Sequence, residues 1–379
     1  MIQERLKALR AEMEKRGITV YVVPTADFHE SEYVGDHFKA RKFITGFTGS
    51  AGTAVITLDE AGLWTDGRYF VQAENQLKDS TVTLYRMGEE GVPTVDEFVK
   101  DRLKEGGCLG FDGRVVNGTW GGKLEKIAAE KNVSMHVTED LIDLIWEDRP
   151  ALSKQPLFIL EEKYSGKSTA DKIADLRKAM KENGADVHIL TSLYDIAWLL
   201  NIRGNDIDYV PVVLSYLVLN ETECIWFLQE EVVDDKIRAY LEENHITTKP
   251  YDAIYDYVPE IPADAVVLMN RGTVNYRIVN SLDKAIKVVD KPNPTELMKA
   301  VKNKTEVDNT RAAHVKDGVA FTKFMYWLKT NIGKIPMTEI SASDYLEARR
   351  REQDNFIELS FNTICAYGAN AAMMHYAAT

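Results

Sequence analysis

The sequence lacks the features that would place the protein in an oxidising compartment or in a membrane. Only three of the 379 residues are cysteine, Cys108, Cys224 and Cys365. They lie far apart and are odd in number, which fits free thiols in a cytosol better than a disulfide framework or a zinc cluster. No run reaches the roughly 18 apolar residues that a membrane-spanning helix needs. Residues 1–16 are interrupted throughout by Glu, Lys and Arg, unlike a signal peptide. These absences predict a cytoplasmic protein.

Positive charge is also scarce. Asp and Glu number 59 against 46 Lys and Arg, for a net charge of −13 at pH 7. Because the basic residues are scattered among acids, no stripe is available to contact a phosphate backbone or anionic lipid. We therefore expect neither nucleic acid nor an anionic membrane as a partner. The 45% hydrophobic content is enough for a folded core, and the length predicts two or three domains.

An internal repeat organises the first two thirds of the chain. "LRAEMEKRG", residues 9–17, aligns with "LRKAMKENG", residues 176–184, and a β-branched stretch follows each copy. Each predicts an amphipathic helix ended by a glycine suited to the left-handed conformation, Gly17 or Gly184, and then a buried strand. A strand hairpin and alternating helices and strands follow both times. We therefore predict an α/β (α+β) fold with two homologous mixed-sheet domains.

The domain boundaries are expected in two stretches that contain proline. "EDRPALSKQPLF" and "DKPNPTEL" are the natural joints. They place the two domains at about residues 1–155 and 156–298, and leave residues 299–379 as a third segment. About 80 residues are few for an independent core. We expect this third domain to be incomplete and to expose apolar side chains such as Ile364, Met373 and Met374.

The third segment is predicted to contain two helices and two strands. "TEVDNTRAAHVKDGVAFTKFMYWLKTNI" predicts a long helix that begins at a capping box of Thr305 and Asp308 and buries one face. "SASDYLEARRREQ" predicts a second helix capped by Ser341 or Ser343. The final "SFNTICAYGANAAMMHYAAT" is typical of strand, turn and strand. The apolar residues that define the buried face of the long helix are Phe321, Phe324, Met325 and Leu328.

Several motifs in a fixed order resemble one family. They are "GFTGSAGTAVIT" with "WTDGRYFVQAENQ" in the first domain, "WLLNIRGNDIDYVPVVLSY" in the second, and "KTEVDNTRAAHVKDGVAFTKF" with "ELSFNTICAYGANAAMMHY" in the third. From about Val20 to its last residue, the chain resembles the N-terminal portion of three-domain aminopeptidase P, the cytosolic X-prolyl aminopeptidases. The resemblance implies two creatinase-like domains, at 1–155 and 156–298, and the beginning of a pita-bread catalytic domain at 299–379.

The resemblance also implies a metal-dependent hydrolase. That family removes an N-terminal residue when proline is second, using two divalent ions, usually Mn²⁺, held by two Asp, one His and two Glu. Paired cations clamp a bridging hydroxide and polarise the peptide carbonyl, and carboxylates with one imidazole suit manganese. All five ligands are expected beyond residue 379. We therefore expect no metal ligand in this chain and no catalysis by the chain alone.

Two residues are candidates for contact with the substrate. By resemblance, His375 would hydrogen-bond the peptide near the scissile bond and follow its developing charge; otherwise it is a structural histidine satisfied by the backbone. Arg68 follows an Asp-Gly turn, which exposes its guanidinium. By resemblance Arg68 would reach a peptide, across the subunit boundary of a homodimer, whereas the alternative is a local ion pair with Asp66. The expected partners are short peptides with proline second and a second copy of the chain.

Other polar groups are interpreted as structural. "GFTGSAG", residues 46–52, lacks the Lys-Ser/Thr ending of a phosphate loop and leads into a strand, so it is predicted to be a tight turn. His29 and His37 are eight residues apart, which matches no common metal motif, so exposed loop histidines are expected. Asp206 and Asp208 are interpreted as solvated acids after a Gly-Asn turn.

Two further functions stay open at this point. The same scaffold without metals would serve as a non-catalytic peptide-binding or dimerisation module. Creatinase-like amidino hydrolysis shares the architecture and needs no metal, but "WTDGRYF" and "GFTGSAG" are closer to the peptidases.

Overall fold

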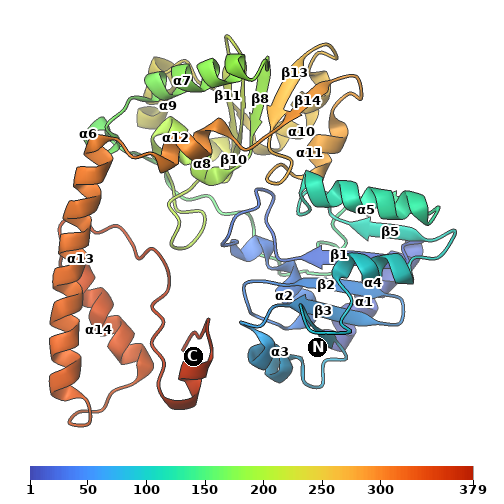
Figure 1. Cartoon of the computed structure of the whole chain (residues 1–379), viewed down its shortest axis with the longest axis horizontal. Coiled ribbons are helices and arrows are strands. Elements are labelled where there is room, and N and C mark those ends of the chain that lie inside the picture. Colours follow the sequence, from blue (N-terminus) through green and yellow to red (C-terminus); the bar gives the residue numbers. More distant parts are fainter. Residues whose placement is uncertain (379) are drawn as a thin grey trace.

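The first domain is a six-stranded mixed sheet with helices on its faces. The computed structural model describes residues 1–378, and Figure 1 shows its three parts. Strand order in the first sheet is β4-β3-β2-β1-β5-β6. The strands are β1 (Val20–Pro24), β2 (Thr53–Thr57), β3 (Ala61–Thr65), β4 (Thr83–Arg86), β5 (Cys108–Phe111) and β6 (Ser134–His136). The helices are α1 (Ile2–Lys15), α2 (Ala40–Thr45), α3 (Phe70–Leu77), α4 (Val95–Arg102) and α5 (Gly118–Glu130).

The second domain repeats this architecture. Its six-stranded sheet has the order β12-β11-β10-β8-β13-β14. The strands are β8 (Val187–Leu190), β10 (Ser215–Leu219), β11 (Cys224–Leu228), β12 (Thr247–Pro250), β13 (Val266–Met269) and β14 (Lys287–Asp290). The helices are α6 (Glu162–Ser165), α7 (Thr169–Glu182), α8 (Leu193–Leu200), α9 (Asp235–Glu243), α10 (Ile254–Tyr257) and α11 (Tyr276–Ser281). A small separate sheet pairs β7 (Phe158–Ile159) with β9 (Ile202–Arg203).

Strand pairing confirms the predicted repeat. In each sheet the central strand, β1 or β8, pairs antiparallel with the first strand of a hairpin and parallel with the strand on its other side. The outer pairs also agree, since both β3–β4 and β11–β12 are parallel. Gly17 and Gly184 end the repeated helices with φ of +68° and +63°, the left-handed conformation that glycine adopts without strain.

The two repeats meet through a contact with approximate two-fold symmetry. Asn117 caps α5 and Asn275 caps α11 at equivalent positions, and the two asparagines form an antiparallel bridge. Four backbone hydrogen bonds flank this bridge as two reciprocal pairs. They run from Gly118 N–H to Val274 O (2.8 Å), Tyr276 N–H to Val116 O (2.7 Å), Thr119 N–H to Arg271 O (3.0 Å) and Arg277 N–H to Gly113 O (2.9 Å). Each domain therefore contributes the same donors and acceptors, as in a symmetric dimer.

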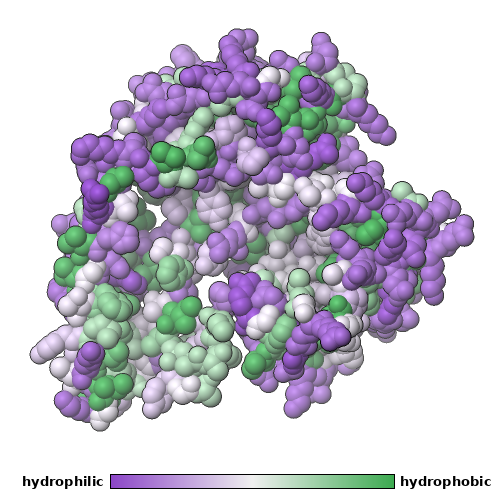
Figure 2. All heavy atoms as spheres, in the orientation of Figure 1, coloured by the Kyte–Doolittle hydropathy of each residue, from purple (hydrophilic) through white to green (hydrophobic). Residues whose placement is uncertain are grey.

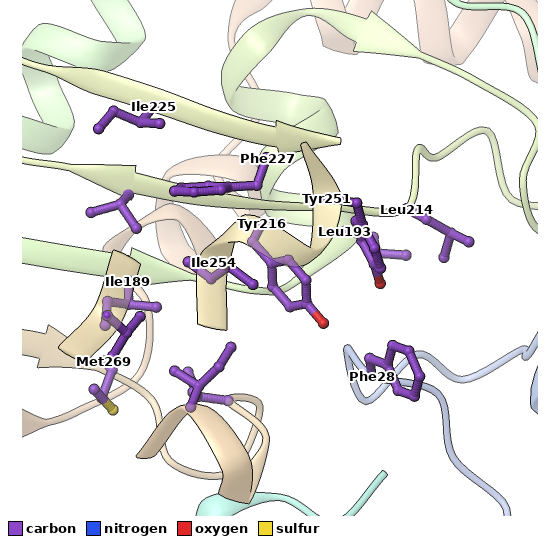
Figure 3. Packing of buried hydrophobic residues seen from close by; sticks show 14 of the residues in the cluster. Phe28, Ile189, Leu193, Leu214, Tyr216, Ile225, Phe227, Tyr251, Ile254 and Met269 are labelled. Atoms are coloured by element: carbon purple, nitrogen blue, oxygen red, sulfur yellow. The ribbon is translucent and has the colours of Figure 1, made fainter. Parts of the chain in front are cut away.

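The two domains also exchange aromatic side chains across this contact. Phe28, from the loop after β1, belongs to the buried apolar cluster of the second domain, and Figure 3 shows it at the side of that cluster. In return, Tyr276 of the second domain packs in a core of the first, with its ring 5.7 Å from that of Phe111. Tyr276 lies so close to α5 that a Cβ at Gly121 would be 2.5 Å from its Cγ. The exchange ties both cores together.

The third part is a pair of helices joined to the second domain. Here α12 (Pro294–Ala300) leads into the long α13 (Lys304–Asn331), and α14 (Glu339–Arg351) packs against α13. Figure 1 shows α13 running away from the second domain at α6. The small core between the two helices is centred on Phe324 and includes stacked Trp327 and Tyr345 rings, with centroids 4.0 Å apart. Of the helices within residues 1–378, none is both long and apolar enough to cross a bilayer.

The helices are found where predicted, but their caps differ. The capping box of α13 consists of Asn303 and Glu306, not Thr305 and Asp308. Asn303 is the cap because its side chain also contacts the second domain: Asn303 Nδ2 donates to Ser165 O at 2.8 Å. This hydrogen bond fixes where the helix begins. The cap of α14 is Thr338, with Ser341 at the third helical position, so the predicted caps Ser341 and Ser343 lie inside the helix. Phe324 is buried in the predicted face, whereas Phe321 is 47% exposed.

The predicted terminal strands are wrong. Residues 352–378 contain only the 3₁₀ turn Gly368–Ala372 and irregular chain. A strand needs a neighbour to receive its backbone hydrogen bonds, and within the described residues no strand pairs with this segment. Its polar groups bind α14 instead, because the Glu339 carboxylate accepts hydrogen bonds from Tyr376 Oη (2.7 Å) and Asn370 Nδ2 (3.2 Å).

The third part exposes more apolar surface than the two front domains. In Figure 2 the hydrophobic atoms gather over α13, α14 and the chain that follows them, while polar atoms dominate the rest of this view. Ile364 is 54% and Met374 72% exposed, as expected, but Met373 is half-buried. The other large apolar side chains exposed from α12 onward are Leu297, Val301, Val315, Val319, Phe321, Tyr326, Ile332, Ile335, Ile340, Ile357, Phe361 and Tyr367.

Candidate functional site

Arg68 lies on an exposed turn between β3 and α3. Its Nε donates to Asp66 Oδ1 at 2.7 Å, and its Nη2 donates to Asp66 Oδ2 at 2.8 Å. These two bonds orient the guanidinium plane, since a carboxylate matches its fork. The hydrogen bond with Arg68 lowers the pKa of Asp66 and in turn raises the pKa of Arg68. The ion pair with Asp66 is thus present, and it leaves the Nη1 side of Arg68 free of Asp66.

His375 lies on that remaining side of Arg68. The distance between Arg68 Nη1 and His375 Nε2 is 3.4 Å, although 307 residues separate the two in sequence. The imidazole also stacks on Tyr69, with ring centroids 5.3 Å apart and an interplanar angle of 19°. Both candidate substrate residues therefore meet in a single exposed cluster of the same chain. Figure 1 shows the C-terminal end close to α3 of the first domain.

Tyr69 and Ser50 are members of this cluster that sequence reasoning missed. Tyr69 is buried, and its hydroxyl is 2.6 Å from Ser50 Oγ. Ser50 belongs to the "GFTGSAG" turn, which leads into β2 as predicted. Gly49 of this turn packs so tightly that a Cβ would be 2.8 Å from the Tyr69 ring. The sequence shows that an aromatic residue, Tyr69, directly follows Arg68. It contains no local pattern from which the contact of Tyr69 with the distant "GFTGSAG" turn could be predicted.

A cavity of about 550 Å³ opens on the other side of this turn. It lies where the first domain, the connecting segment and the second domain meet, and Ser50 is among its lining residues. Arg41, on α2, also lines it. The guanidinium of Arg41 donates to Phe47 O at 2.5 Å and to Gly49 O, and these hydrogen bonds hold the turn in place. The cavity and the Arg68–Tyr69–His375 cluster therefore share one supporting loop.

His29 is not the exposed loop histidine that was expected. It is 2% exposed, and its ring bridges the two front domains, with Nδ1 3.0 Å from Thr191 O and Nε2 2.6 Å from Tyr251 Oη. Because a carbonyl can only accept, Nδ1 carries the proton and Nε2 accepts from the tyrosine. Burial lowers the pKa of His29 to about 4, so the ring is neutral at pH 7. His37 remains partly exposed, with Nδ1 2.8 Å from Pro150 O.

Asp206 is also buried, contrary to the expected solvated turn. Its carboxylate accepts hydrogen bonds from the backbone N–H of Gln155 (3.1 Å) and of Leu214 (2.9 Å). Burial raises the pKa of Asp206, against the effect of these hydrogen bonds. The side chain therefore holds the connecting segment on the second domain, while Asp208 stays exposed as predicted.

The described residues do not fit a pair of metal ions. Within residues 1–378, no three His, Cys, Asp or Glu side chains come together in an arrangement that would hold one ion. His375 has an arginine and a tyrosine as neighbours, which are not metal donors in this arrangement. The cluster consists of an arginine that can donate hydrogen bonds and a histidine stacked on a tyrosine ring. These groups are suited to binding a peptide, and we assign them no reaction step that involves a metal.

Fold and cluster together define the class of protein. Two family models of the creatinase/prolidase N-terminal domain match residues 5–145 and 148–306, and the model of metallopeptidase family M24 matches residues 308–379. The two creatinase/prolidase models together match most of the chain, which therefore belongs to the creatinase/prolidase-like proteins.

Within that family the chain matches proteins called probable Xaa-Pro aminopeptidase P. The relative from Sordaria macrospora is 39% identical over 98% of this chain, and the one from Neurospora crassa is 39% identical over the same share. The chain spans 63% and 56% of the lengths of these two relatives.

A solved structure is similar over almost the whole chain. The X-prolyl aminopeptidase of Caenorhabditis elegans, a cytosolic enzyme with a di-nuclear active site, has 32% identity and a TM-score of 0.93 over 99% of this chain. The match covers 64% of that enzyme. This confirms the resemblance to aminopeptidase P and the predicted fold of two creatinase-like domains followed by the beginning of the catalytic domain.

Proposed function

We propose that the whole protein is a cytoplasmic X-prolyl aminopeptidase, which hydrolyses the first peptide bond of short peptides with proline in second position. The observation that supports this most strongly is the TM-score of 0.93 with a cytosolic X-prolyl aminopeptidase over 99% of the chain. The reaction would depend on two divalent ions, of which Mn²⁺ is the expected kind. Their ligands would lie outside the described residues, and residues 1–379 alone would not turn over substrate.

Arg68 and His375 are proposed to contact the peptide. Asp66 accepts from Nε and Nη2 along one edge of the Arg68 guanidinium, so its remaining N–H groups are directed for donation to a carbonyl oxygen. His375, stacked on Tyr69, would hydrogen-bond the peptide near the scissile bond. We further propose a homodimer. That Arg68 reaches the peptide bound by the partner chain stays a prediction.

The test is an assay of the full-length protein with Mn²⁺ on an Arg-Pro-Pro peptide, with Arg-Ala-Pro as the control substrate. Turnover should require proline in second position, stop on chelation and return with Mn²⁺. Arg68→Ala and His375→Ala should each lower kcat/KM by about 10- to 100-fold, because each removes one hydrogen bond to the peptide. The matched control is Arg86→Ala, a half-buried arginine of the first domain that is paired with the carboxylates of Glu74 and Glu89; it should leave kcat/KM unchanged.

Three outcomes would contradict the proposal. Equal turnover of both peptides would show that proline is not recognised. Proline-dependent binding without turnover, in full-length protein supplied with Mn²⁺, would instead favour a non-catalytic peptide-binding module. Turnover by residues 1–379 at an ordinary enzymatic rate would show that the ligands do not lie outside this chain.

A further inference from the structure

Arg41 is a buried cation with no acidic partner. The side chain lines the interdomain cavity and is 3% exposed. Three of its five N–H groups donate to neutral oxygens, those of Thr25 Oγ1 (2.9 Å), Phe47 O (2.5 Å) and Gly49 O. Among residues 1–378, no carboxylate lies within ion-pair distance of it, and the other two N–H groups have no acceptor. A buried charge without a counter-ion is costly, so this site is suited to an anion.

The acidic residues around the cavity do not neutralise Arg41. The buried one, Asp206, is already held by the backbone N–H groups of Gln155 and Leu214. Asp36 is paired with Lys39. The charged residues exposed at the mouth of the cavity are Glu32, Asp36, Lys42 and Asp208. Of these, Lys42 follows Arg41 directly in sequence and has no ion pair among the described residues. Arg41 therefore keeps its charge without a counter-ion, although the lining as a whole has four acidic side chains against three basic ones.

The cavity adjoins the candidate substrate residues through Ser50. This residue lines the cavity and its hydroxyl is 2.6 Å from the Tyr69 hydroxyl, while the ring of Tyr69 stacks on His375. Tyr69 and Ser50 are thus the two residues that link His375 to the cavity wall. The volume of about 550 Å³ is in the range of pockets that bury small ligands.

We propose that this cavity is a second subsite, which binds a carboxylate carried by the downstream part of the peptide. Arg41 receives the carboxylate with its two free N–H groups, and Lys42 adds charge at the mouth. The inference rests on the proposed function, because it takes a peptide as the ligand. The carboxylate is either the free C-terminus or an acidic side chain, and both place the same group on Arg41.

The experiment measures peptide binding to the 379-residue chain by calorimetry, with a chelator present so that no turnover interferes. The probes are the pentapeptide Ala-Pro-Ala-Ala-Ala, its C-terminal amide, and the amide with Glu in fifth position. The free acid should bind about tenfold more tightly than the amide, since a charge-assisted hydrogen bond is at stake. Recovery of affinity with Glu would identify an acidic side chain as an equivalent source; no recovery would assign the site to the C-terminus.

Two variants locate the effect. Arg41→Met should abolish the preference for the free acid. Because Arg41 also holds the turn at Phe47 and Gly49, Lys42→Gln serves as the second variant: it is exposed, and it should reduce the preference by about threefold. The matched control is Lys7→Gln, an exposed lysine on α1, which should leave the preference unchanged.

Equal affinity for acid and amide, or no binding of either, would overturn the proposal. So would a preference that survives both Arg41→Met and Lys42→Gln. A parallel series with alanine in place of proline separates this result from the proposed function. A preference for the acid that persists without proline supports the subsite even if the full-length protein shows no proline-dependent turnover.

Discussion

Two adjacent glycines of α5 should respond in opposite ways to the same substitution. Gly121 and Gly122 are both inside the helix, where Gly→Ala normally stabilises by about 1 kcal/mol through helix propensity. A Cβ at Gly122 would meet no atom within 4 Å. A Cβ at Gly121 would lie 2.5 Å from Tyr276 Cγ and 2.8 Å from Tyr276 Cβ. Only the second substitution reaches the contact between the two front domains.

The expected magnitude follows from how little Tyr276 can move. Its side chain is 5% exposed, and its backbone N–H is hydrogen-bonded to Val116 O at 2.7 Å. A new rotamer would not relieve the clash, because Tyr276 Cβ itself is too close. Overpacking costs about 1–3 kcal/mol, and here we expect the upper end. Gly121→Ala should therefore destabilise by about 2 kcal/mol after the propensity gain is subtracted, whereas Gly122→Ala should stabilise by about 1 kcal/mol.

The assay is urea unfolding followed by circular dichroism at 222 nm, with the unfolding midpoints of the two variants compared with wild type. In a Tyr276→Ala background, where the ring is absent, the penalty for Gly121→Ala should shrink, since coupled sites are not additive. Equal stabilisation by both glycine substitutions would show that α5 and Tyr276 are not in tight contact. The reasoning about the interdomain packing would then be refuted.

Three other substitutions test separate parts of the molecule. His29 has a pKa of about 4 in the fold against about 6.5 when unfolded, so the unfolded chain binds more protons between these values. Stability should fall by about 3 kcal/mol as the pH drops from 6.5 to 4, and in His29→Gln this part of the loss should be absent. Lys299→Met should destabilise by about 3 kcal/mol, because Asp195, 1% exposed, would lose its 2.7 Å ion pair. Tyr69→Leu should remove the ring-current shift of the His375 imidazole protons in NMR spectra.

Each of these has a matched control. His314→Gln changes an exposed histidine of α13 and should keep the acid-induced loss seen in wild type. Lys304→Met breaks the exposed pair with Asp308 and should cost less than 1 kcal/mol. Tyr69→Phe keeps the ring and should preserve the NMR shift. An unchanged acid profile in His29→Gln, equal costs for both lysines, or a shift that survives Tyr69→Leu would contradict the respective contact.

The sequence was sufficient for features that neighbouring residues determine. Helix periodicity with Gly17 and Gly184 at the helix ends revealed the repeat, because glycine is favoured where the chain turns left-handed. The order of strand hairpin, helix and strand then predicted the mixed sheets. The exposure of Arg68 also followed from local turn chemistry, and the ion pair with Asp66 was one of its two interpretations.

What the sequence did not reveal depends on distant partners. His29 is buried only because Thr191 and Tyr251 of the other domain receive its ring, and no local pattern encodes that meeting. Likewise Asn303 caps α13 in preference to the predicted Thr305 because Ser165 accepts its amide.

The structure of the terminal segment also depends on distant parts of the chain. The final segment from residue 360 was predicted to form strand, turn and strand, but strand formation requires a partner edge, which local sequence does not supply. The meeting of Arg68 with His375 was not derivable from spacing either, since 307 residues intervene.

The reciprocal hydrogen bonds around Asn117 and Asn275 have a consequence for assembly at high concentration. Each front domain presents donors and acceptors that match those of the other. A chain that opens at the connection between them therefore exposes halves that fit the halves of another opened chain equally well. Concentrated refolding should consequently yield domain-swapped dimers that use only contacts already present within one chain.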